Sequence, residues 1–206
     1  MQPTRTHRLP LLATLPALAT LACASVGPPP PPDVADRARS AASYSGSLRV
    51  RLKGPGLRAR TRALVAFERP RNLRIEVPGP AGARLIAVAR AERLTAVFPA
   101  DRAVFSGGAT AGDLDALLGV ALTPTEVMDL LVGAPPARVK LYQARWGPAL
   151  PRQITATLPD DTRLEVDVDE PELGPRLPAA AFDEPPHEGY RPIDAGAARD
   201  LIGGRR

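Results

Sequence analysis

Apolar and polar residues alternate along several short stretches of this chain, the pattern of strands with one buried face. The clearest stretch spans residues 47–53, where Leu48, Val50 and Leu52 share one side before a Gly-Pro-Gly turn. The same pattern predicts further strands at residues 61–67, 73–77, 85–89, 94–98 and 103–105. Because the turns between them are short, we expect an antiparallel meander of these strands.

The period then changes from that of a strand to that of a helix. Two amphipathic helices are predicted, at residues 110–119 and 123–133, each ending at a glycine. The second begins with Thr123 as a cap, Pro124 at the first helical position and Glu126 completing a capping box.

The remaining elements flank this central part. A helix capped by Asp33 is predicted up to residue 43, and strands at residues 137–142, 153–158 and 163–169. From residue 170 the chain is rich in proline and predicted to be irregular, with Phe182 as its anchor. The predicted fold class is therefore α+β, mostly β: a strongly curved antiparallel sheet, an unclosed β-barrel, with short helices covering its concave side.

The N-terminus has the pattern of a secretory signal, with Arg5 and Arg8 before an apolar run at residues 9–22. That run is shorter than the roughly 20 residues of a membrane-spanning helix. Residues 19–23 resemble a bacterial lipobox, in which the signal is cut just before a lipid-modified cysteine, here Cys23, the only cysteine. The alternative is a signal cut elsewhere that leaves Cys23 as a thiol without a role.

These observations divide the chain into a signal peptide at 1–22, a Pro-rich tether at 23–33, a folded domain at 34–192 and a flexible or short helical tail at 193–206. A proline-rich tether extends by about 3.1 Å per residue, so it would reach roughly 30 Å. Known lipoproteins kept at the inner membrane tend to carry Asp directly after the cysteine. Ala24 in that place implies the outer membrane, with the domain facing the periplasm.

The net charge of +5 comes almost entirely from arginines, which alternate with apolar residues. This arrangement favours a solvated strand face over a nucleic-acid site, and leaves open a modest affinity for anionic membranes. Catalytic groups are scarce, and His187 is the one histidine beyond the signal. Glu165, Asp167 and Asp169 share one side of a predicted strand; a solvated face fits them better than a cation site. We expect no enzyme activity, no cofactor and no metal.

The order of these elements resembles the LolB-like family of outer-membrane lipoprotein receptors and related LolA-like domains. The closest local matches are residues 73–87, as a strand–loop–strand unit, and residues 105–135, as a two-helix segment. The resemblance implies an apolar cavity that holds lipoprotein acyl chains beneath a helical lid. It also implies that lipoproteins are accepted from a LolA-like periplasmic carrier and released into the outer membrane. We expect a monomer held at the membrane by its lipid anchor.

The inward side of the predicted strands supplies the candidate lining of the cavity: Leu48, Val50, Leu52, Val65, Phe67, Leu73, Ile75, Val77, Leu85 and Phe98. The same residues would be ordinary core if the barrel were filled. A second hypothesis is a non-catalytic envelope scaffold that binds another protein and has an occluded concave face.

The resemblance also assigns a membrane-facing loop to Pro80, Ala81 and Gly82. The family's loop carries an exposed leucine thought to aid insertion, and Ala81 occupies that position here. Alanine offers far less apolar surface to a bilayer. An ordinary turn between two strands is an equal interpretation of these three residues.

Overall fold

The computed structural model describes residues 29–54 and 57–203. The predicted signal segment and Cys23 lie outside the described residues. The strands form one sheet in the order β10-β6-β5-β4-β3-β2-β1-β9-β8-β7. Their bounds are β1 (Ser43–Gly54), β2 (Leu57–Glu68), β3 (Asn72–Gly79), β4 (Gly82–Arg90), β5 (Arg93–Phe98), β6 (Ala103–Gly108), β7 (Leu141–Trp146), β8 (Pro151–Thr157), β9 (Arg163–Leu173) and β10 (Arg191–Pro192).

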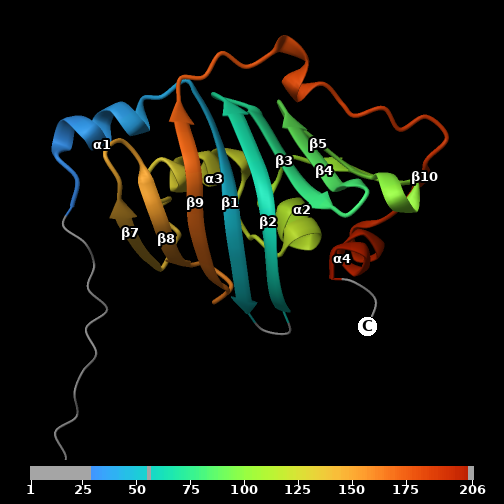
Figure 1. Ribbon diagram of the computed structural model, residues 1–206. Helices are drawn as coiled ribbons and strands as arrows, with labels where there is room; N and C mark the ends of the chain where they lie inside the picture. Colours follow the sequence, from blue (N-terminus) through green and yellow to red (C-terminus); the bar gives the residue numbers. More distant parts are fainter. Residues whose placement is uncertain (1–28, 55–56, 204–206) are drawn as a thin grey trace, which may run out of the picture.

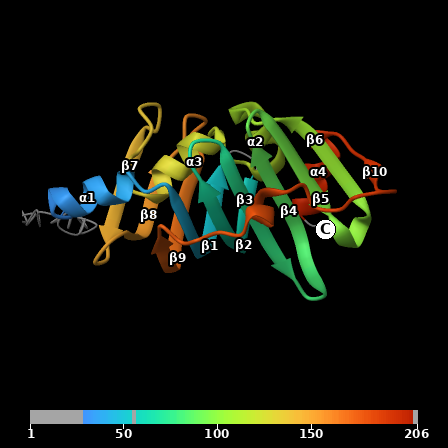
Figure 2. The ribbon, with the colours of Figure 1, turned by 90° about the horizontal axis from the view of Figure 1, so that it is seen from above.

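Neighbouring strands are antiparallel except for the short β10, which runs parallel to β6. The sheet is strongly curled but does not close, because β7 and β10 lie at its opposite edges. Helices α2 (Ala111–Leu118) and α3 (Pro124–Leu131) lie on its concave side (Figures 1 and 2). The fold class predicted from the sequence is confirmed.

The two central helices begin as their sequences predict. The Thr110 hydroxyl accepts a hydrogen bond from the backbone N–H of Asp113, and Gly119 ends α2 with a φ of 69°, a conformation that favours glycine. Thr123 and Glu126 form the full capping box of α3. These local signals fix where both helices start, and therefore which of their faces meets the sheet.

Strands β1, β2 and β4 begin three or four residues before the predicted stretches, and two further predicted boundaries, of β7 and β9, are also wrong. Residues 137–140 form a turn in which the Val139 N–H donates to the Pro136 carbonyl, so β7 begins only at Leu141. Strand β9 continues beyond residue 169 to Leu173. Pro171 fits within it because it lies where the pairing with β1 is irregular, and a proline is tolerated at a bulge.

The first helix is also shorter than predicted. Helix α1 (Pro32–Arg39) starts at a proline without a side-chain cap, and Asp33 lies in its first turn, 3.1 Å from Arg37. Strand β1 already begins at Ser43. At the other end of the chain, residues 195–203 form helix α4 (Ala195–Gly203), where Ala198 is fully buried.

The proline-rich segment after β9 crosses the outer face of β3, β4 and β5 (Figure 1). Phe182, in the short 3₁₀ helix η2 (Ala179–Phe182), is 4% exposed, which confirms it as the anchor of this segment. Arg90 pairs with Asp183 at 3.1 Å, and the Thr95 hydroxyl donates to Glu184. As a result β5 is buried on both faces, whereas the outer face of β1 and β2 is largely solvated.

Candidate functional site: an apolar cavity

A cavity of about 330 Å³ lies between the concave face of the sheet and the helices. This volume is at the lower end of the ~300–1,000 Å³ typical of small-molecule sites. Leucine, valine, isoleucine and alanine side chains make up most of the lining, and the few polar residues are Arg58, Arg60, Thr61, Arg84 and Arg199. The cavity is therefore suited to an apolar ligand whose polar end remains outside.

Seven of the ten residues predicted as lining do line the cavity: Leu48, Val50, Leu52, Val65, Ile75, Val77 and Leu85. They come from four consecutive strands, and their side chains face inward because alternate residues of a strand share one face. Whether these residues bind a ligand stays a prediction.

The other three, Phe67, Leu73 and Phe98, are buried in the core beside the cavity, each at most 2% exposed. The ring of Phe67 stacks on Tyr44, with ring centroids 5.2 Å apart. We call Tyr44, Phe67 and Leu73 the closed end of the cavity. On β1 and β2 the aromatic side chains of Tyr44 and Phe67 fill space that smaller residues, such as Val50 and Ala59, leave empty farther along.

The helices supply lining residues that the predicted set lacked. Leu114 and Leu117 of α2 and Val127, Leu130 and Leu131 of α3 face the cavity. Their spacing of three and four residues is the signal that could have placed them there, since it marks the helical face turned to the sheet. The far wall is supplied by Leu164 and Val166 of β9.

Helix α3 is held over the cavity by polar contacts at both of its ends. Partial burial of Glu126 acts to raise its pKa, but hydrogen bonds from Arg138 and Thr123 outweigh this and hold the pKa below its usual value. Near the C-terminal end, the Tyr142 hydroxyl donates to the Leu130 carbonyl at 3.3 Å, and burial raises the pKa of that phenol. These contacts hold α3, which acts as the lid of the cavity, in place over the sheet.

The cavity opens where β3 leaves β2. The two strands pair only from Leu64 opposite Glu76 to Glu68 opposite Asn72. Within the described ranges, residues 57–63 of β2 pair with β1 alone. Figure 1 shows α2 behind the resulting space. We call Leu52, Ala59 and Val77, which line the cavity on this side, its open end.

Helix α4 borders the open end and is hydrogen-bonded to β4 and to α2. The Arg84 guanidinium, on β4, donates to the carbonyls of Leu201 and Ile202 at 2.7 and 2.9 Å. Arg199 donates to the carbonyl of Ala116 on α2 at 3.1 Å. Ile202 adds an apolar side chain to the cavity lining.

The predicted membrane-facing loop is a two-residue turn, Pro80 and Ala81, and Gly82 begins β4 with a φ of 109°. All three residues are exposed. Because β1 and β3 run in the same direction, the turn lies at the end of the sheet where the cavity opens. Figure 2 shows the tip of this hairpin extending beyond the rest of the sheet.

The carboxylates of β9 pair with arginines of β1. Asp169 lies 3.1 Å from Arg49 and Glu165 lies 3.5 Å from Arg51, and these residues alternate with the buried residues of their strands. His187 is half-buried, and its Nδ1 lies 2.8 Å from the Pro185 carbonyl oxygen. Among the described residues, His, Cys, Asp and Glu side chains form no cluster of three that could hold a metal ion. No helix in this part of the chain is long and apolar enough to cross a membrane.

No protein-family model matches the sequence, and no curated protein sequence is similar to it. The solved structures that are similar to this one include the following two. A LolA superfamily protein from Nitrosomonas europaea is 11% identical, with 74% of this chain and 96% of that chain covered and a TM-score of 0.44. A DUF1329 family protein from Desulfovibrio piger is 10% identical, with 74% and 95% covered and a TM-score of 0.46. Similarities this low identify neither a family nor a function for this chain.

Proposed function

We propose that this protein is a non-catalytic, membrane-anchored lipoprotein that binds acyl chains in its apolar cavity. In this proposal it acts as a LolB-like receptor at the outer membrane, accepting lipoproteins from a LolA-like periplasmic carrier. Lipid-modified Cys23 anchors it to the membrane, and the proline-rich tether holds the domain in the periplasm as a monomer.

The observation that carries this proposal is the cavity itself. Its walls are apolar on the sheet side and on the helix side, and its polar residues are largely arginines near the open end. Each methylene moved from water into such a site contributes about 0.8 kcal/mol. The scaffold hypothesis expected an occluded concave face, so the cavity favours lipid binding over it.

The test is a titration of the full chain, carrying Cys23→Ser to prevent lipidation, with a fluorescent fatty acid. We expect saturable binding to one site. Ala63→Leu places a larger side chain in the cavity and should weaken this binding while the fold is retained. The matched control is Ser47→Leu, which adds the same side chain on the outer face of β1 and should bind normally. Absence of saturable binding, or equal binding by both variants, would contradict the proposal.

Delivery into the membrane is a separate step, and the turn at Ala81 is its candidate element. A leucine at this exposed tip would add apolar surface that can enter a bilayer. We expect Ala81→Leu to raise the rate of lipoprotein transfer into vesicles. Ala42→Leu is the control, since Ala42 is exposed at the opposite end of the sheet. Equal transfer by both variants would count against the loop assignment.

A further inference from the structure

The edge of β2 that borders the open end has backbone groups without a neighbouring strand. Strand β2 pairs with β1 along its whole length, but with β3 only from Leu64 onward. An unpaired strand edge presents a row of N–H and C=O groups that another strand can pair with. Arg58 and Arg60, on this part of β2, are exposed and are among the residues that line the cavity.

The register shows which groups point outward from this edge. The Arg69 N–H donates to the Ala42 carbonyl, and in an antiparallel ladder bonded pairs recur at every second residue. Counting back without a shift, residues 59, 61 and 63 bond to β1. Arg58, Arg60 and Arg62 therefore direct their N–H and C=O groups away from β1. The Thr61 hydroxyl donates to the Arg62 carbonyl at 3.1 Å, so that carbonyl has a side chain of its own strand as its partner.

The arginines at this edge of β2 lack the neighbouring carboxylates that the arginines of β1 have. Arg62, Arg60 and Arg58 lie directly opposite Arg49, Arg51 and Lys53 of β1. Like charges in such positions destabilise a sheet. On its other side β1 faces the carboxylates of β9, which pair with Arg49 and Arg51.

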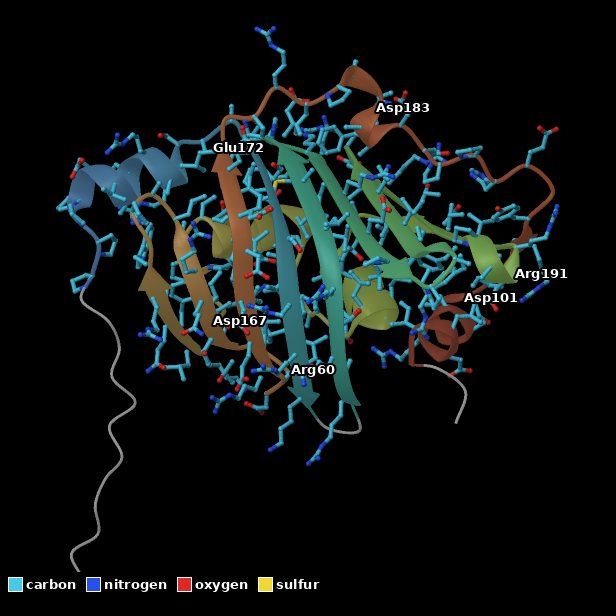
Figure 3. The ribbon with its side chains drawn as sticks, in the orientation of Figure 1. Arg60, Asp101, Asp167, Glu172, Asp183 and Arg191 are labelled. Carbon is cyan, nitrogen blue, oxygen red and sulfur yellow. The ribbon has the colours of Figure 1, made fainter. Side chains whose placement is uncertain are left out.

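Beside β2 no equivalent set of carboxylates is present: in the part of the chain that the structure describes, Arg58, Arg60 and Arg62 form no ion pair. Figure 3 shows Arg60 at this end of the sheet and Asp167 on β9, two strands away. An added strand that carries carboxylates would form ion pairs with the arginines at the β2 edge, as β9 does with the arginines of β1.

We propose that residues 58–62 of β2 bind, as an added strand, an extended acidic peptide segment that follows the acyl group of a lipid-modified protein. This inference rests on the proposed function, because it places the acyl chain in the cavity and the peptide at the adjoining edge. Alternating donors and acceptors match a peptide backbone, whereas the headgroups of an anionic membrane would use only the charges. The protein's own tether fits poorly, since its five consecutive prolines at 28–32 have no N–H to donate.

The test compares three probes on the full chain carrying Cys23→Ser: palmitate, a palmitoylated peptide of alternating Glu and Ser, and the same peptide N-methylated at alternate residues. A few hydrogen bonds and ion pairs should make the acidic palmitoyl peptide bind about tenfold more tightly than palmitate. N-methylation should remove most of that gain. An equal affinity of the methylated and unmethylated peptides, or no gain over palmitate, would overturn the inference.

Two variants at one position distinguish the contribution of the backbone hydrogen bond to peptide binding from that of the side-chain charge. Arg62→Pro removes the outward N–H and leaves the bonds to β1, whereas Arg62→Ala removes only the side chain. We expect Arg62→Pro to lose most of the tenfold gain and Arg62→Ala to lose about twofold to threefold. Both should bind palmitate normally, because Arg62 is not one of the residues that line the cavity. An equal loss in both would show binding by charge alone; a matching loss on phosphatidylglycerol vesicles would assign the edge to a membrane surface instead.

The outcomes distinguish this inference from the proposed function. If palmitate itself does not bind, the proposed function fails. If palmitate binds and the peptide adds nothing, only the strand-pairing inference fails. If Arg62→Pro disturbs the fold, a loss of palmitate binding reports it. The methylated peptide then decides the question on the chain without that substitution.

Discussion

The closed and open ends of the cavity lie along the same strands but differ in how the concave face is occupied. At the closed end Tyr44 and Phe67 stack, and Leu73 is 2% exposed. At the open end Ala59 and Val77 are only partly buried, and the strands that carry them have separated. The alternation of apolar residues is the same at both ends. A filled core and an empty cavity thus differ in side-chain size and strand pairing rather than in hydrophobic pattern.

The separation of β2 from β3 is what turns part of a core into a site. Where the two strands pair, residues 64–68 of β2 have a neighbouring strand on both sides. The Arg69 guanidinium, 2.8 Å from Asp129 of α3, joins the lid to this end. Where the strands diverge, the backbone of β2 and the cavity are both accessible. The closed end therefore contributes to the stability of the fold, and the open end gives a ligand access to the cavity.

The largest expected effect is a difference in the free energy of unfolding between two Leu→Ala variants, one at each end of the cavity. Leu73→Ala removes a side chain from the closed end and should lower the free energy of unfolding by about 2–5 kcal/mol. Leu52→Ala faces the empty cavity, so fewer contacts are lost and we expect a cost below about 2 kcal/mol. Urea denaturation of both variants measures the difference. Equal costs would mean that the open end is packed as tightly as the closed end.

A smaller, pH-dependent effect is expected at the lid. Glu126→Gln keeps an amide that can complete the capping box but removes the ion pair with Arg138, at a cost of about 0.5–1 kcal/mol near pH 7. The lowered pKa of Glu126 means that its charged form is stabilised by folding. This contribution is fully present above the pKa of about 4.3 in the unfolded chain and is lost as the pH falls through the lowered value.

The measurement is chemical denaturation of the wild-type chain and Glu126→Gln between pH 7 and pH 2. Their unfolding free energies should converge as the pH falls below about 4. Glu188→Gln, at an exposed position, is the control and should match the wild type throughout. A difference between Glu126→Gln and the wild type that persists at low pH would show that the carboxylate charge is not its origin.

The smallest effect concerns two tyrosine hydroxyls. The Tyr44 hydroxyl is buried at the closed end and has no hydrogen-bond partner among the described residues, and burial raises the pKa of this phenol. Tyr44→Phe keeps the stacked ring, so we expect the free energy of unfolding to rise by up to about 0.5 kcal/mol. Tyr142→Phe removes the hydrogen bond to the Leu130 carbonyl, which is long at 3.3 Å, and should lower the free energy of unfolding by about 0.5 kcal/mol. Thermal unfolding of both variants checks the opposite signs.

Local signals predicted much of this fold. Strand alternation placed Leu48, Val50 and Leu52 on one face, and the capping residues Thr110 and Thr123 placed α2 and α3. The strand at 137–142 was wrong because the turn after Pro136 depends on a backbone bond that periodicity does not reveal.

The cavity could be predicted only in part. Phe67 and Phe98 have the same alternation as the lining residues, yet they fill the core, because occupancy depends on how the helices and strands pack in three dimensions. The alternation of apolar and polar residues gave no indication that β2 and β3 separate. The like-charged pairs such as Arg60 opposite Arg51 also became visible only once the register was known.

The most direct test of the central claim, that the cavity holds an acyl chain, is the affinity for saturated fatty acids of increasing length, measured by calorimetry on the full chain carrying Cys23→Ser. Each added methylene should raise the affinity about fourfold, the equivalent of about 0.8 kcal/mol, until the cavity is full. The affinity should then level off, and Ala63→Leu should bring that plateau to shorter chains. An affinity that rises without a plateau, or that is unchanged by Ala63→Leu, would contradict the account.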